Sequence, residues 1–160
     1  MIRDTQKRKL YRAEVLHSLR QEPLFRDIHL TRDYANRVYR SPWFRSEATR
    51  LGDAQMHLDF PAVTVLDGRG CSKGMAWRHR GTIRLPRWCR NRLYVLHELT
   101  HLLVYRQNQF IKEPGHGRLF AAVYLRVLRR WAGKEAAAEM TGLFKNHQVH
   151  YRPRLHNPSV

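Results

Sequence analysis

The sequence predicts a single α+β domain, in which several helices pack on a small, mostly antiparallel sheet of about three strands. Three observations support this fold class. Apolar residues follow helical spacing toward both ends of the chain, a short β-branched run lies near the middle, and glycine and proline punctuate the segment around it. The chain of 160 residues, 42% of them hydrophobic, can bury a core without crosslinks. We place the domain at residues 1–150 and a basic tail at residues 151–160.

The first part of the chain predicts three helices. Residues 3–20 carry apolar side chains close to helical spacing, which are Leu10, Ala13, Leu16 and Leu19. A second helix is expected after Thr31, which we interpret as its N-cap. Ser41 followed by Pro42 predicts the start of a third, short helix that ends near residue 49.

The middle of the chain predicts the sheet. Residues 62–66 form a β-branched run, bounded by a proline and by an Asp-Gly pair. Residues 75–78 and 82–85 are expected to form two further strands around a turn at Gly81, and Pro86 closes the second of them. The side chain of Trp77, in the first of these two strands, is expected to pack in the core or to line the rim of a cleft.

The last part of the chain predicts three more helices. The first runs from about residue 90 to 107 and has apolar residues around most of its circumference, which indicates that it is buried centrally. These residues are Leu93, Val95, Leu96, Leu99, Leu102, Leu103 and Val104. The next helix covers residues 117–131 with Gly133 suited to its C-terminal cap, and the last covers residues 134–145.

The predicted central helix contains the sequence His97-Glu98-Leu99-Thr100-His101, which has the HExxH pattern. Side chains four residues apart on a helix project from one face, so His97 and His101 can bind one Zn²⁺ ion together. Glu98 is rotated by about 100° from His97, which places it near the ion but at an oblique angle. This placement suits a general base that takes a proton from the attacking water. Without a metal, burying these polar groups in an apolar helix would be unfavourable.

A catalytic zinc site generally takes three protein ligands and leaves one position open. His116 is the preferred third ligand, because it directly precedes the next long helix and has a glycine on either side. Glu113 is the rival candidate, and it would make a site of two histidines and one glutamate. Peptide hydrolysis also needs a second group that stabilises the oxyanion. Four candidates are available, and the sequence does not choose among Tyr105, His147, His150 and Tyr151.

Charge and cysteine content limit the partners and the compartment. The formal charge of +17 favours polyanions, so nucleic acid is a possible partner, although no known reader motif occurs. Cys71 and Cys89 are expected to be free thiols. The sequence lacks the run of about 18 apolar residues needed to span a membrane, and its start has no secretory signal. We therefore expect a cytoplasmic protein that does not contact the membrane.

The two histidine motifs resemble those of SprT-like and other zincin metallopeptidases, in which a downstream His-Gly-x-x-Phe supplies the third ligand. The chain looks closer still to a small group of actinobacterial metallohydrolases of about this length. The matching stretches are residues 3–6, 83–88, 95–101, 116–120 and 142–147. The resemblance implies a minimal zincin fold, zinc at His97, His101 and His116, and Glu98 as the base. One departure is Arg118-Leu119, where relatives often have Pro-Glu.

The sequence therefore predicts a zinc-dependent metallohydrolase, most readily a metallopeptidase that acts on a protein or peptide substrate. Two alternatives stay open at this point. The chain could be a nucleic-acid-binding module in which zinc is structural and fully ligated by the protein. It could also be a regulatory protease that cleaves a repressor. Substrate, oligomeric state and DNA binding are not set by the sequence.

Overall fold

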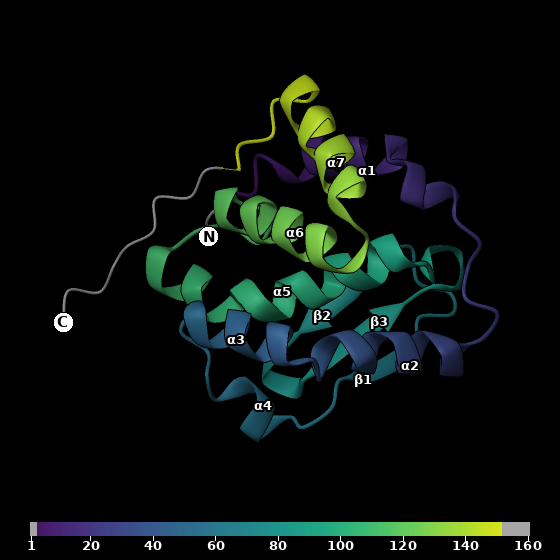
Figure 1. Ribbon diagram of the computed structural model, residues 1–160, viewed down its shortest axis with the longest axis vertical. Helices are drawn as coiled ribbons and strands as arrows, with labels where there is room; N and C mark the ends of the chain where they lie inside the picture. The colour runs from purple at the N-terminus through teal and green to yellow at the C-terminus, as the bar shows by residue number, and fades with distance from the viewer. Residues whose placement is uncertain (1–2, 152–160) are drawn as a thin grey trace.

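A long helix, α5 (Arg92–Ile111), lies between a layer of helices and a small sheet (Figure 1). The computed structural model describes residues 3–151 and has the predicted α+β architecture. Helix α6 (Arg118–Trp131) packs on one side of α5, and the sheet packs on the other. The apolar residues predicted to surround α5 are all 1% exposed or less. The predicted central burial of this helix is therefore confirmed.

The sheet has three strands in the order β1-β3-β2 and is mixed. Strand β1 (Thr64–Asp67) runs parallel to β3 (Thr82–Leu85), and β2 (Met75–Trp77) runs antiparallel to β3. The antiparallel expectation therefore holds for one pairing and not for the other. The reason is that β3 lies between β1 and β2 in the sheet, so it pairs with both of them, parallel to one and antiparallel to the other. The turn before β3 places Gly81 at a φ of 55°, a conformation that favours glycine.

The two edges of the sheet differ. Helix α2 (Ile28–Tyr39) covers the outer edge of β1, where the Asn36 amide exchanges two hydrogen bonds with the Val63 backbone, both 3.0 Å long. The Arg32 side chain donates another hydrogen bond, to the carbonyl oxygen of Val65. Strand β2 is the opposite edge, and its residues line a cavity beside α5. An edge strand next to a cavity can pair with an added extended chain.

The boundaries of the two amino-terminal helices differ slightly from those predicted. Helix α1 (Lys7–Leu16) is followed by a short 3-10 turn at Ser18–Gln21 instead of continuing to residue 20. The N-cap of α2 is Asp27 and not Thr31, because the Asp27 carboxylate accepts the Leu30 N–H at 2.9 Å. Acidic residues accept such hydrogen bonds strongly. Thr31 lies inside the helix, where its hydroxyl donates to the Asp27 carbonyl.

The remaining helices follow the predicted order with one addition. Helix α3 (Pro42–Arg50) has the predicted Ser41 N-cap, whose hydroxyl accepts the Phe44 N–H. A short helix, α4 (Met56–Asp59), was not predicted. Helix α7 (Lys134–Asn146) packs against α6 and α1. The turn before α7 contains Gly133 at a φ of 102°, which ends α6 as expected.

Three further expectations can be compared with the described chain. Cys71 and Cys89 are both free thiols, as predicted. No helix within residues 3–151 is long and apolar enough to cross a membrane. The half-buried Trp77 ring lies beneath the Arg84 guanidinium, at 5.2 Å from the ring centroid. The predicted basic tail, Tyr151 excepted, lies outside the described residues.

Candidate metal centre

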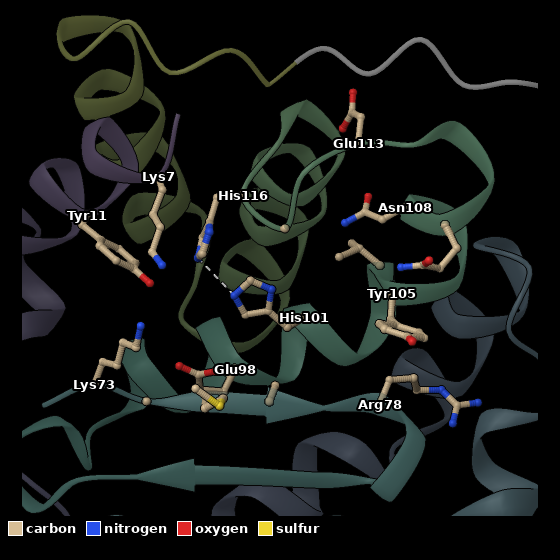
Figure 2. A pocket seen from close by; sticks show the side chains of 16 residues that line it. Lys7, Tyr11, Lys73, Arg78, Glu98, His101, Tyr105, Asn108, Glu113 and His116 are labelled. Carbon is tan, nitrogen blue, oxygen red and sulfur yellow. Dashed lines mark hydrogen bonds between the residues drawn. The ribbon is translucent and has the colours of Figure 1, made fainter. Parts of the chain in front are cut away.

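The three predicted ligand histidines converge on one point. His97 and His101 project from the same face of α5, and their Nε2 atoms are 3.1 Å apart. His116 directly precedes the Gly117 N-cap of α6, and its Nε2 lies 3.2 Å from that of His101 (Figure 2). Nitrogen ligands of a tetrahedral ion, each at about 2.1 Å, would stand about 3.4 Å apart. The spacing therefore fits three ligands of one ion.

Within the described residues, these three histidines form the one His, Cys, Asp and Glu cluster able to hold a metal ion. Their ligand atoms all lie within 4.8 Å of one another. His97 and His116 are buried, at 2% and 6% exposed, and His101 is half-buried. The Phe120 ring packs below the cluster, with its centroid 4.4 Å from that of His101 and 5.0 Å from that of His97.

Two carboxylates fix the outer nitrogens of the histidine rings. Glu14, on α1, lies 2.6 Å from Nδ1 of His97. Asp4, just before α1, lies 2.7 Å from Nδ1 of His116 and also accepts the backbone N–H of that residue. A carboxylate accepting from Nδ1–H leaves the Nε2 lone pair available to a metal, and such partners orient metal-binding histidines in known sites.

Asp4 and Glu14 were not predicted from the sequence. Asp4, Lys7, Tyr11 and Glu14 are separated by three, four and three residues, so they lie along one face of α1 and the turn before it. The signal that could have revealed them is the presence of acidic residues at helical spacing in an otherwise basic segment. A neighbouring residue, Gln6, donates to the carbonyl oxygen of His116 at 3.0 Å and further anchors that loop.

The rival ligand Glu113 has a different contact. Its Oε2 accepts the backbone N–H of Leu119 at 2.9 Å, in the first turn of α6. A Cβ at Gly117 would come within 2.7 Å of the same oxygen, so glycine leaves the space that this cap needs. Glu113 therefore caps α6, and it is His116 that joins the histidines of α5. Gly115 has no comparable close contact.

Glu98 lies beside the cluster and faces the cavity. Its side chain is 6% exposed and lies against Gly74, where a Cβ would overlap the Oε1 atom. Burial raises the pKa of Glu98 to about 7, although the neighbouring charge of His97 opposes this rise. A carboxylate with a pKa near neutrality is suited to exchange protons with a substrate.

The pKa values of the three histidines are shifted in different directions. Burial lowers the pKa of His101 well below its ordinary value, and the positive charges of His97, His116 and Lys7 lower it further. Burial also lowers the pKa of His116, against the influence of Asp4. For His97, burial is outweighed by the charge and hydrogen bond of Glu14, so its pKa is raised. Neutral imidazoles are the form that binds metals.

A cavity of about 330 Å³ opens beside the cluster, between α1, α5 and β2 (Figure 2). Its wall includes Lys7, Tyr11, Gly74, Glu98, His101 and His116. The Tyr11 ring stands edge-on to that of His116, with centroids 5.1 Å apart.

The four proposed oxyanion groups lie in different places. Tyr105 lines this cavity and is 41% exposed. His147 lines a separate hollow, and His150 and Tyr151 line another. Tyr11, which was not among the candidates, packs its ring against two of the histidines, with its centroid 5.8 Å from that of His97 and 5.1 Å from that of His116.

Searches against protein-family models, curated proteins and solved structures find no match to this chain. The interpretation of the centre therefore rests on its own residues and their geometry.

Proposed function

We propose that the protein is a zinc-dependent metallopeptidase, with zinc held by His97, His101 and His116 and with Glu98 as the general base. The observation that carries the proposal is the convergence of three Nε2 atoms beside a buried carboxylate and an open cavity. A set of three imidazoles with one open side suits catalytic zinc. The same arrangement supports the proposed kinship with SprT-like zincins.

The protein's own side chains would supply the proton transfers. Zinc, when bound, contributes Lewis acidity and makes water a better nucleophile at neutral pH. Glu98 would accept the proton of the attacking water and return it to the leaving amine. The Tyr11 phenol would donate a hydrogen bond to the substrate oxygen on which negative charge develops. The cavity position of both side chains supports these roles.

A peptide is the substrate class that the sheet favours. Strand β2 forms the sheet edge along the cavity, and Met75 and Ala76 line its wall. An extended peptide could add to this edge through main-chain hydrogen bonds and pass beside Glu98. Such pairing would bring a peptide carbonyl toward the histidines without requiring one particular side chain.

The alternative of a nucleic-acid-binding module with structural zinc is favoured by the charge of +17. Structural zinc sites are closed by four protein ligands. Within residues 3–151, three ligand side chains meet, and a cavity adjoins them. This open side favours the catalytic interpretation, and DNA binding stays a prediction.

The test compares wild type with Glu98→Gln and His97→Ala. Metal analysis of the purified proteins should find about one zinc per chain in wild type and in Glu98→Gln, and none in His97→Ala. Wild type should cleave unfolded casein, and Glu98→Gln should lose at least about a hundredfold in rate because it cannot move the proton. A wild-type protein without stoichiometric metal, or equal cleavage by Glu98→Gln, would contradict the proposal.

A further inference from the structure

We propose that the cavity contains a carboxylate-binding subsite, formed by Lys7 with Lys73 and Tyr11. The preferred substrate would then be a peptide with a carboxylate close to the bond that is cut. The carboxylate could be a free C-terminus or an aspartate or glutamate side chain. This inference rests on the proposed peptidase function for the reaction, but the binding it describes can be measured without turnover.

Lys7 is the central group of this subsite. It lies one helical turn before Tyr11 on α1, and its Nζ is 5.7 Å from the centroid of the Tyr11 ring. Figure 2 shows its side chain directed into the cavity beside His116. His101 and His116 line the same cavity as Lys7. The ammonium therefore lies within electrostatic reach of the metal centre.

This position favours an anionic ligand. Lys7 is half-buried, and its ammonium would repel a divalent ion held by the histidines. Among the described residues, no carboxylate lies within ion-pairing distance of the Lys7 ammonium or that of Lys73. A carboxylate of the substrate would offset this repulsion and would accept charge-assisted hydrogen bonds from the ammonium groups.

The carboxylates around the centre already have other partners. Asp4 and Glu14 are hydrogen-bonded to histidine rings, and Glu113 caps α6. Of the basic residues in the wall, Arg78 is paired with the buried Asp53. Lys7 and Lys73 are thus left facing a cavity whose remaining carboxylate is Glu98.

The space and the polarity of the cavity fit this ligand. Its volume of about 330 Å³ adjoins a second hollow of about 250 Å³, and Tyr11, Lys73 and Glu98 line both. Volumes of this size suit small ligands or a short peptide segment. The ammonium groups of Lys7 and Lys73 and the phenol of Tyr11 are hydrogen-bond donors in the cavity wall, and such donors suit a carboxylate.

The experiment measures binding of three matched peptides to zinc-loaded Glu98→Gln by calorimetry. All three are N-acetylated and share one neutral sequence. The first ends in an amide, the second ends in a free carboxylate, and the third is an amide with one internal aspartate. We expect at least one carboxylate peptide to bind about tenfold more tightly than the neutral amide. The peptide that does so identifies which source of carboxylate is preferred.

Two charge-removing variants separate the subsite from general electrostatics. Lys7→Met, in the Glu98→Gln background, should reduce the preference for the carboxylate to below about threefold. It should also tighten zinc binding, because a neighbouring positive charge is gone. Lys134→Met removes the same charge from an exposed position at the start of α7, outside the cavity wall, and should change neither the carboxylate preference nor zinc binding. If Lys7 were needed only for the structure of the site, Lys7→Met would weaken both peptide binding and zinc binding.

Three results would overturn the inference. The first is equal or absent binding of all three peptides. The second is a carboxylate preference that is unchanged in Lys7→Met. The third is a carboxylate preference that falls as much in Lys134→Met as in Lys7→Met. A short DNA strand that displaces the peptides and loses affinity only in Lys7→Met would assign the subsite to phosphate instead. Cleavage of casein without any carboxylate preference would refute the subsite alone. A preserved preference without casein cleavage by wild type would refute the peptidase alone.

Discussion

Two of the three candidate ligands have their outer ring nitrogen held by a carboxylate. Glu14 and Asp4 lie 2.6 Å and 2.7 Å from Nδ1 of His97 and His116. Each interaction sets the tautomer and the ring orientation before a metal arrives. Because the rings are already ordered in the folded protein, metal binding does not carry the free-energy cost of ordering them.

Removing these carboxylates should weaken metal binding without removing a ligand. We expect Asp4→Asn and Glu14→Gln each to raise the zinc dissociation constant by about 10–100-fold, because the rings lose a charged partner. Competition with a chelator measures this change. Asp33→Asn, an exposed change on α2, is the control and should leave the constant unaltered. Affinities equal to wild type in both variants would show that the carboxylates do not support the site.

The buried Glu98 should make the stability of the metal-free protein depend on pH. Its pKa in the fold is raised by burial to about 7 from the ordinary 4.5. Its stabilising contribution is therefore complete below about pH 4.5 and is lost as the pH rises through about 7. The full contribution amounts to about 3 kcal/mol.

Urea unfolding of metal-free wild type and Glu98→Gln at about pH 5 and about pH 7.5 tests this dependence. Wild type should lose about 2–3 kcal/mol relative to the variant over this interval, because glutamine does not titrate. Subtracting the variant removes the effects of the other carboxylates. A difference between the two proteins that is the same at both pH values would contradict a raised pKa of Glu98.

At the scale of the elements, α1 and the loop before α6 complete a centre that α5 begins. One face of α1 and the turn before it provides Asp4, Lys7, Tyr11 and Glu14. The loop that carries His116 is held by Asp4, by Gln6 and by the Glu113 cap of α6.

The Glu113 cap and the His116 ligand can be separated by mutation. Glu113→Ala should lower the free energy of unfolding by about 1 kcal/mol, as expected for a lost helix cap, and should keep about one zinc per chain. His116→Ala should lose the metal, because it removes a ligand. Denaturation and metal analysis of the two variants measure these effects. If Glu113→Ala lost as much zinc as His116→Ala, Glu113 would itself be a ligand.

The features that the sequence predicted correctly depend on interactions between residues that are close together in the chain. The central helix and its paired histidines follow from apolar and helical spacing alone, and the Ser41-Pro42 start of α3 follows from capping chemistry. The parallel pairing of β1 with β3 depends on how distant segments meet, so strand patterns could not give it. Contacts of Glu14 and Asp4 with histidines more than 80 residues away are likewise tertiary.

At the scale of the whole molecule, four of the thirteen acidic residues are buried, whereas Arg78 and Arg90 are the buried basic residues of the described chain. Glu47 is buried between Arg50 and Arg126, Asp53 is paired with Arg78, and Glu14 is bonded to His97. The excess of basic residues is therefore left largely to the surface. A field of this sign would attract anionic substrates over a distance, and it would do so less at high salt.

Metal binding should stabilise the whole fold, because the centre joins α1, α5 and the start of α6. Zinc at a hundredfold excess over its dissociation constant should add about 2.7 kcal/mol to the free energy of unfolding. For a protein of this size, we expect the midpoint of thermal unfolding to rise by about 5–10 °C. Scanning calorimetry with and without a chelator measures the shift, and His116→Ala should not respond.

Three imidazoles are expected to hold one divalent ion and to leave one side of it open. Anomalous diffraction at the zinc edge, on crystals of the zinc-loaded protein, tests this arrangement. We expect one strong peak about 2.1 Å from Nε2 of His97, His101 and His116, with no fourth protein ligand. A missing peak, or a peak bound by other side chains, would contradict it.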